Sequence, residues 1–287
     1  MSKVFVAGAT GNIGTALLEQ LRDTDAEVVA GVHDPDKMKP FADSGVEARL
    51  FDYKDPDSIS RAMQGCDRMF FALPFTEKMG HYGHLVVEAA KASGIEYIVR
   101  SSGYAASSDA HWRLGREHGM VDQFVEDSGI PFTVLRPNTF MQYFSSSLAE
   151  MVKTGVIALP EEDACVSYID VRDIAACAAR LLLDNEGHVE NFYALTGPEG
   201  LGLAEVADTI TEAAGREVKY LPVPEEEFVA TLQDMGMEQW NINMLVSLSR
   251  VVKLGMAGNV THAVSYLTDT PARTFADFAK EYSAVWK

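Results

Sequence analysis

The chain has 287 residues, enough to bury one large hydrophobic core, or one core and a smaller lobe. Its 42 acidic residues against 24 basic ones give a net charge of −18, which repels the phosphate backbone of a nucleic acid and an anionic membrane surface. Direct binding to nucleic acid or to a membrane is therefore not expected.

Histidines and cysteines, the residues that most often bind transition metals, are few and scattered. Cys66, Cys165 and Cys177 form no Cys-x-x-Cys pair, which predicts neither a disulfide framework nor a thiolate metal site. His81 and His84 have no third ligand spaced with them, which favours a surface loop over a metal site. No apolar run approaches the ~18 residues that span a bilayer, and the amino-terminal residues lack the pattern of a signal peptide. We expect a soluble, cytoplasmic protein without a bound metal.

The first 137 residues alternate short β-branched or aromatic runs with longer segments of helical spacing. This alternation is typical of a parallel sheet covered by helices on both faces, whose buried strands are nearly continuous in apolar residues. Between the first two strands, residues 12–22 have the apolar spacing of a helix, which completes a βαβ unit. The predicted strands are Val4–Ala7, Glu27–Val32, Glu47–Phe51, Arg68–Ala72, Tyr97–Ser101 and Phe132–Arg136.

A glycine-rich loop follows the first strand and opens the first predicted helix. Gly8 permits the tight turn, Gly11 lets main-chain N–H groups approach a pyrophosphate, and Gly14 lets the helix pack close to the strand. The helix terminus then presents unsatisfied donors and a partial positive charge to the anion. This order predicts a Rossmann domain, an α/β fold with a doubly wound parallel sheet. Its predicted pyrophosphate seat consists of Gly8, Thr10, Gly11, Asn12 and Ile13.

After about residue 138 the alternation ends, and prolines punctuate irregular segments. We expect a smaller α/β carboxy-terminal lobe, with Leu203–Ala214 and Thr274–Trp286 as amphipathic helices. Ser167–Leu183 combines a short β-branched run with an Ala- and Leu-rich helix, and should return to the first domain. The predicted organisation is an NAD(P)-binding domain over residues 1–150, with 167–187 packing back on it, and an interleaved substrate lobe over 151–287.

Glycines spaced at three and three are the form that this loop takes in short-chain dehydrogenases. Together with Phe51–Tyr53, Val134–Met141 and Tyr168–Ile174, the loop resembles the NmrA-like, atypical branch of that superfamily, close to quinone oxidoreductase type 2 and triphenylmethane reductase. The resemblance runs from residue 3 to about residue 230. Within this range, Gly202–Phe228 is similar to the family's small carboxy-terminal lobe. It implies an NAD(P)-binding oxidoreductase with a small-molecule substrate.

The residues after the second strand bear on the choice of nicotinamide cofactor, because an acid there binds a free ribose hydroxyl whereas a cation accommodates a 2′-phosphate. The resemblance implies NADP, since relatives with that preference have Arg at the position of His33 and often Lys at that of Lys37. Asp34 opposes a preference for NADP, and His lacks the fixed charge of Arg, so NAD is the alternative cofactor. The alternative for His33 is that it is an ordinary loop residue without a role in binding. The resemblance also places at the cofactor Asp52, Tyr53, Ala72, Leu73 and Pro74.

Most short-chain dehydrogenases use a Tyr-x-x-x-Lys pair for catalysis, and this sequence has none. A predicted helix over 112–128 places His118 and Asp122 one turn apart, where the acid could fix the tautomer of the imidazole or raise its pKa. The alternative is a solvated polar stripe, because both residues face away from the apolar side of that helix. The candidate catalytic residues are Tyr104 after the fifth strand, His118, and Asn138 after the sixth strand, each with ordinary loop or surface packing as the alternative.

An electron-poor acceptor takes hydride without a strong acid beside it. We therefore predict an NAD(P)H-dependent reductase that transfers hydride to a small quinone-like, conjugated or cationic acceptor, with the cofactor supplying the chemistry. The protein would stabilise the developing negative charge through hydrogen bonds. The missing Tyr-Lys pair motivates an alternative, a non-catalytic NAD(P)-binding redox sensor that acts through a protein partner. The sequence leaves the oligomeric state open.

Overall fold

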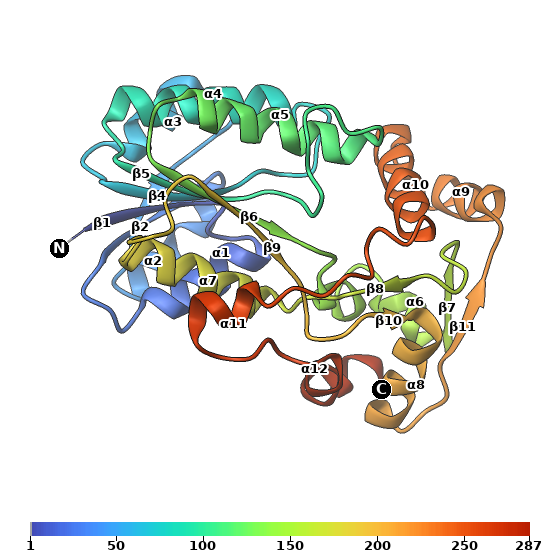
Figure 1. The fold of residues 1–287 in the computed structure, drawn as a ribbon. Coiled ribbons are helices and arrows are strands. Elements are labelled where there is room, and N and C mark those ends of the chain that lie inside the picture. Colours follow the sequence, from blue (N-terminus) through green and yellow to red (C-terminus); the bar gives the residue numbers. More distant parts are fainter. Residues whose placement is uncertain (1) are drawn as a thin grey trace. The chain divides into compact units, whose positions relative to one another are not determined.

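A parallel sheet forms the centre of the fold in the computed structural model, which describes residues 2–287 (Figure 1). Within these residues the sheet has seven strands in the order β3-β2-β1-β4-β5-β6-β9. All neighbouring pairs from β3 to β6 are parallel. The strands are β1 Lys3–Ala7, β2 Glu27–Val32, β3 Glu47–Leu50, β4 Arg68–Ala72, β5 Tyr97–Ser101, β6 Phe132–Pro137 and β9 Asn191–Leu195.

Helices cover both faces of this sheet. One face carries α3 (Pro56–Met63), α4 (Met79–Ser93) and α5 (Arg113–Asp127), and the other carries α1 (Asn12–Leu21), α2 (Lys39–Asp43) and α7 (Val171–Leu183) (Figure 1). Because strands between two helical layers meet no solvent on either face, every residue of β5 is buried. The predicted doubly wound α/β fold is confirmed, with predicted strands and observed strands agreeing to within one residue at each end.

The histidine pair of the sequence lies on helix α4, so the prediction of a surface loop is wrong. His81 and His84 are both exposed on that helix. Two glycines lower the helical propensity of this segment, but packing requires one of them, since a Cβ at Gly83 would lie 2.5 Å from Cγ1 of Val121 on α5. Close packing between α4 and α5 therefore outweighs the local preference. Among the described residues no group of three or more potential metal ligands occurs.

The chain divides into two compact units. The first contains residues up to 111, then 115–136 and 174–193, and the second contains 112–114, 137–173 and 194–287. The predicted boundary at residue 150 thus lies inside the second unit, and the segment that returns to the first unit is 174–193 where the sequence predicted 167–187. Arg68 of β4 holds the returning segment, because its Nη1 donates a hydrogen bond of 2.7 Å to the carbonyl oxygen of Leu182.

The second unit has its own aromatic core. Phe144 packs edge to face with both Tyr168 and Phe275, and the buried Trp286 donates a hydrogen bond of 2.7 Å from Nε1 to the carbonyl oxygen of Phe144. Two small sheets pair β7 (Val156–Leu159) with β11 (Lys219–Pro222) and β8 (Cys165–Val166) with β10 (Leu201–Gly202). Its helices are α6 Ala149–Lys153, α8 Leu203–Ala214, α9 Glu225–Asp234, α10 Gln239–Lys253, α11 Ala263–Thr268 and α12 Phe275–Tyr282, with short 3-10 turns at Met141–Ser145 and Ser283–Trp286.

The helix predicted over 203–214 is observed as α8, and the segment 274–286 is α12 with the 3-10 turn that follows it. No helix within residues 2–287 has both the length and the apolar character that crossing a bilayer requires.

Candidate dinucleotide and acceptor site

The glycine-rich loop makes a tight turn between β1 and α1. Gly8 has φ +78°, in the left-handed region that strains any residue with a Cβ. The amide of Gly11 donates a hydrogen bond of 2.9 Å to the carbonyl oxygen of Gly8. A Cβ at Gly14 would lie only 2.1 Å from that same oxygen, so a side chain there would push α1 away from the loop. The three glycines therefore shape one continuous piece of main chain at the carboxyl end of β1.

The amino end of α1 is left without a competing anion. Its N-cap is Gly11, which has no side chain to cap the helix, and no acidic residue lies in the first turn. First-turn amides have no acceptor within a helix and so remain available to a bound anion. Gly11 and Asn12 are exposed and Thr10 is half-buried, whereas the side chain of Ile13 is buried and leaves only its amide for such a role.

Helix α8 of the second unit has an amino end with a similar backbone, but a side chain of its own first turn caps it. Its N-cap, Gly202, has the same extended backbone as Gly11, with φ −76° and ψ 158° against −84° and 171°. In α8, however, Glu205 lies in the first turn, and its Oε2 accepts a hydrogen bond of 2.9 Å from the amide of Gly202. Helix α8 thus carries an anionic side chain at its own amino end, whereas α1 does not.

The loop after β2 exposes two basic side chains. His33 follows the strand directly, and Lys37 ends a 3-10 turn over Pro35–Lys37. Asp34, the acid that could oppose a 2′-phosphate, is the N-cap of that turn, where its Oδ1 accepts a hydrogen bond of 3.0 Å from the amide of Asp36. Part of the capacity of this carboxylate is therefore used within its own turn.

The residues after β3 and β4 meet near the glycine-rich loop. The hydroxyl of Tyr53 donates a hydrogen bond of 3.1 Å to the carbonyl oxygen of Ala72, and a Cβ at Gly8 would lie 3.4 Å from the same oxygen. The Tyr53 ring stacks on Tyr82 of α4 at 5.3 Å between centroids, and burial raises the pKa of its hydroxyl well above the usual value. Half-buried Asp52 precedes Tyr53 in the chain, and the end of β4 is followed by Leu73 and Pro74.

His118 belongs to a cluster of buried charges in the first unit. Its Nδ1 lies 3.5 Å from Nη2 of Arg100, a side chain of β5 with no exposed surface. Asp122, one turn further along α5 and 2% exposed, forms ion pairs with both Arg100 and Arg136. Its Oδ2 accepts hydrogen bonds from Nε of Arg136 at 3.1 Å and from Nη2 at 2.8 Å.

The expectation that Asp122 would raise the pKa of His118 is wrong. The carboxylate pairs with the two arginines, and burial together with the positive charges of Arg100 and Arg136 lowers the pKa of His118 to about 3. The two residues do not form a solvated stripe either, since Asp122 is buried and His118 is half-buried. The helical spacing of this pair was right, but the cations from β5 and β6 decide its electrostatics.

The loop that carries Tyr104 is packed closely on α5. A Cβ at Gly103 would lie 2.8 Å from Cδ2 of His118, and a Cβ at Gly119 would lie 2.1 Å from the carbonyl carbon of Ser107. Both contacts leave no room for a side chain, so they hold the segment after β5 against the helix that carries His118. Tyr104 itself is half-buried.

Asn138 lies in the second unit, where its side chain joins three segments of chain. Its Nδ2 donates hydrogen bonds of 2.8 Å to the Oγ of Ser167 and to the carbonyl oxygen of Ala257, and its Oδ1 accepts one of 2.9 Å from the amide of Thr139. The side chain is 5% exposed. Both amide hydrogens therefore have acceptors within the fold, and a catalytic role for Asn138 stays a prediction that nothing in this geometry supports.

Comparison with known proteins agrees with this architecture. The model of the NmrA-like family matches residues 1–263. The chain belongs to the NmrA-like family. This NmrA-like protein is 31% identical to the NAD(P)H azoreductase of Xenophilus azovorans, over 99% of each chain.

Two solved structures have the same fold as this NmrA-like protein. The NADPH-dependent quinone oxidoreductase of Escherichia coli, in complex with NADPH, is 27% identical with a TM-score of 0.87, over 97% of this chain and 99% of that one. The triphenylmethane reductase of Citrobacter sp. is 24% identical with a TM-score of 0.87, over 99% and 100%. The family inferred from the sequence motifs is confirmed.

Sequence reasoning missed several members of the cluster around His118 in this NmrA-like protein. Gly103, Arg100 and Arg136 were assigned no part in the site. One signal was present: a charged residue inside the otherwise apolar strand that ends at Ser101 is rare unless it is paired. That signal indicates a buried partner for Arg100 but does not say which one.

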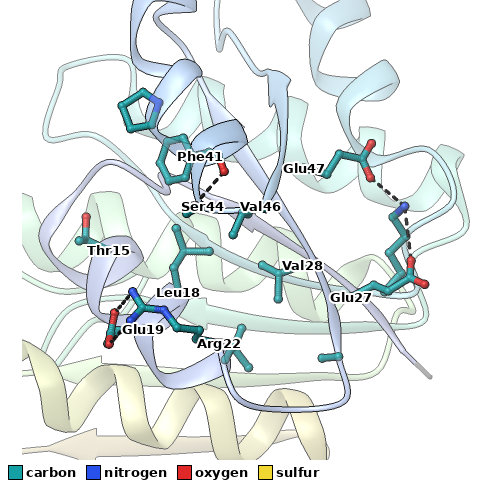
Figure 2. Close-up of a pocket in the computed structure, with 15 residues that line it drawn as sticks. Thr15, Leu18, Glu19, Arg22, Glu27, Val28, Phe41, Ser44, Val46 and Glu47 are labelled. Atoms are coloured by element: carbon teal, nitrogen blue, oxygen red, sulfur yellow. Dashed lines mark hydrogen bonds and ion pairs between the residues drawn. The ribbon is translucent and has the colours of Figure 1, made fainter.

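A cavity of about 500 Å³ lies elsewhere in the first unit, between α1, α2 and the strands β2 and β3 (Figure 2). Lys3, Glu27 and Glu47 begin β1, β2 and β3, so their end of the cavity lies at the edge opposite to the glycine-rich loop. Its charges pair with one another, with Lys3 Nζ 2.9 Å from Glu47 and 3.7 Å from Glu27, and Arg22 bound to Glu19. Ligands of open α/β sheets bind at the carboxyl ends of the strands, so we do not place the site there.

Proposed function

We propose that this NmrA-like protein is an NAD(P)H-dependent oxidoreductase that transfers hydride to a small quinone-like, azo or other conjugated acceptor, cationic ones included. The observation that carries the proposal is the amino end of α1, built from glycine and left without a capping side chain or an acid. The azoreductase and the NADPH-bound quinone oxidoreductase, both at more than a quarter identity over nearly the whole chain, support the reaction class.

The residues present fit a nicotinamide dinucleotide. The main chain of Gly11 and Asn12 would hold the pyrophosphate, Asp52 and Tyr53 would flank the adenine, and Leu73 and Pro74 would line the cofactor beyond β4. His33 and Lys37 favour NADPH over NADH, because both are exposed and Asp34 caps a turn. When bound, the cofactor supplies the hydride, and the protein supplies binding, orientation and electrostatics.

Tyr104 and His118 are the side chains of the first unit that we assign to the acceptor. Each carries a polar hydrogen and lies on or against the loop after β5, at the carboxyl edge of the sheet. Their hydrogen bonds would stabilise the negative charge that hydride transfer leaves on a quinone oxygen or an azo nitrogen. No strong acid is required for such acceptors, which is consistent with the missing Tyr-Lys pair.

The test mixes purified protein with NADPH or NADH and a panel of quinones, azo dyes, enones and cationic dyes, and follows nucleotide oxidation. We expect turnover with at least one class of acceptor and tighter binding of NADPH than of NADH. Sub-millimolar nucleotide binding without turnover on any acceptor would favour the redox sensor that acts through a protein partner. Failure to bind either nucleotide would overturn both functions.

A further inference from the structure

We propose that Arg100 is a positioning residue that fixes the imidazole of His118 as its Nε2–H tautomer, so that Nε2 donates a hydrogen bond to the acceptor during hydride transfer. The catalytic part of this proposal rests on the proposed function. The tautomer is a property of the free protein, and it can be measured without turnover.

The direction of the hydrogen bond between the two side chains follows from their chemistry. A guanidinium has only donors, so across the 3.5 Å between Nη2 of Arg100 and Nδ1 of His118 the ring nitrogen must be the acceptor. In a neutral imidazole one nitrogen accepts and the other carries the hydrogen. The hydrogen therefore lies on Nε2.

Arg100 is itself held in place on two sides. Asp122 forms an ion pair with its Nη1, and the guanidinium carbon lies 5.7 Å from the centroid of the Phe71 ring. The side chain has no exposed surface, so it cannot turn toward solvent. A planar guanidinium fixed at one nitrogen presents its other nitrogen in one direction, which is toward His118.

The charges around His118 keep its ring neutral. Arg100 from β5 and Arg136 from β6 are cations, and Asp122, the acid on the same helix, is already paired with both of them. Protonation of the ring would add a third positive charge beside a single carboxylate that already pairs with two cations. A neutral imidazole is the form that polarises a substrate through a hydrogen bond rather than by releasing a proton.

Nε2 lies on the side of the ring that faces the loop after β5. A Cβ at Gly103 would be 3.2 Å from Nε2 and 2.8 Å from Cδ2, so the ring edge rests on the main chain of Gly103. Nδ1 of His118 makes the contact with Arg100, so Nε2 is the ring nitrogen on the side of Gly103. The carboxyl edge of a parallel sheet is where α/β proteins bind their ligands, so Nε2 lies at the edge where an acceptor would bind.

The step balances without an acid from the protein. Hydride adds to one end of an azo or conjugated quinone system, the π electrons move to the other end, and a hydrogen bond from Nε2 stabilises the resulting anion. Water supplies the proton that completes the hydrazo or hydroquinone product. Because the imidazole keeps its hydrogen throughout, its protonation state does not change in the cycle.

The first experiment measures the tautomer in the full-length protein by nitrogen-15 NMR of the histidine rings, with the His118 signals assigned from their loss in His118→Gln. We expect the neutral Nε2–H form from about pH 5 to pH 8, with no titration in that range. In Arg100→Lys, which keeps the charge but not the fork, we expect Nδ1–H to become populated. A wild-type ring that titrates within this range, or that carries its hydrogen on Nδ1, would overturn the proposal.

The second experiment measures catalysis in Gly103→Ala, which moves the ring of His118 while leaving every charge of the cluster in place. We expect kcat to fall about tenfold or more, with an unchanged dissociation constant for NADPH. Gly202→Ala, a matched change in the second unit where a Cβ would lie 3.6 Å from the nearest side-chain atom, should leave both quantities unchanged.

The two experiments fail in different ways. Full kcat in Gly103→Ala, with the His118 signals shifted, would overturn the hydrogen bond to the acceptor but not the positioning of the ring by Arg100. If no acceptor is reduced at all, the proposed function fails and the tautomer still decides the role of Arg100. If Arg100→Lys does not fold, the wild-type spectrum alone tests the proposal, because a hydrogen on Nδ1 of His118 would contradict a hydrogen bond from Arg100 to that nitrogen.

Discussion

The glycine-rich loop and the cluster around His118 follow β1 and β5, which end at the same edge of one sheet, yet they are built in opposite ways. The loop works by the absence of side chains, since a Cβ at Gly14 would collide with the main chain of Gly8 and no acid or cap blocks α1. The cluster works through a buried carboxylate on α5 that forms ion pairs with cations from β5 and β6. The loop should therefore be sensitive to added volume, and the cluster to a change of charge.

Gly11→Val gives the largest expected effect. Its branched side chain would occupy the space in front of the first-turn amides of α1, so the affinity for either nicotinamide nucleotide should fall by more than about a hundredfold, or roughly 2.7 kcal/mol. Calorimetric titration with NADPH measures this. Gly202→Val, at the similar N-cap of α8, should bind as the wild type does. Equal affinities in the two variants would show that the pyrophosphate is not held by this loop.

Asp122→Asn tests the sensitivity of the cluster to charge. The variant keeps the size of the side chain but leaves the buried Arg100 and the part-buried Arg136 without their anion, so the free energy of unfolding should fall by about 3–5 kcal/mol. Urea denaturation measures the change. Asp43→Asn, which removes an exposed ion pair with Lys39, should cost less than about 1 kcal/mol. A comparable loss in both variants would contradict the role of burial.

The depressed pKa of His118 predicts a dependence of stability on pH. The unfolded chain binds a proton at this residue below about pH 6.5, whereas the folded protein does not until about pH 3, so stability falls as pH is lowered through this range. Relative to His118→Gln, the wild type should lose at most about 1.4 kcal/mol per pH unit. Urea denaturation at pH 6 and pH 5 measures the difference.

A residue of the second unit contributes to the same pH range with the opposite sign. Burial raises the pKa of Glu161 to about 7, so its contribution to stability is lost as pH rises through that value. Since Glu161 is present in both proteins, it cancels when wild type and His118→Gln are compared. Parallel pH profiles for the two proteins would mean that the imidazole is no harder to protonate in the fold than in water.

His33→Arg has the smallest expected effect. The guanidinium adds a fixed charge and a second donor at an exposed position, which should favour NADPH over NADH by a further few-fold, about 1 kcal/mol. The ratio of the two dissociation constants measures this preference. Lys39→Arg, a change in the following helix, serves as the control and should leave the ratio unchanged. If His33→Arg leaves it unchanged too, His33 does not face the ribose.

The two regions also differ in how far the sequence predicts them. The loop is a run of seven consecutive residues after an apolar strand, so spacing alone indicates its shape and its ligand. The cluster joins residues 100, 118, 122 and 136, and only the i, i+4 relation of His118 and Asp122 is visible in the sequence. Arg100 pairs in register with Val134, which brings β6 and thus Arg136 to the same place, and no local pattern contains that information.

The place where the chain passes from one compact unit to the other is also not visible in a local sequence pattern. The chain leaves the first unit at Arg136, directly after the buried part of β6, because the amide of Asn138 already binds the carbonyl oxygen of Leu195 in the second unit. This hydrogen bond joins two segments that lie far apart in the sequence, and each of them contains both polar and apolar residues. Periodicity identifies a strand but not the segment with which its last residues pair.

The contrast between α1 and α8 has a consequence for the lifetime of the protein. Helix α8 closes its first turn with Glu205, whereas the first turn of α1 has neither a capping side chain nor an acidic residue, and under the proposed function a bound nucleotide would supply the anion. A ligand that binds only the folded state at a hundred times its Kd adds about 2.7 kcal/mol to stability. With its nucleotide absent, the chain would open more often at α1 and be degraded faster, so its abundance would follow the supply of that nucleotide.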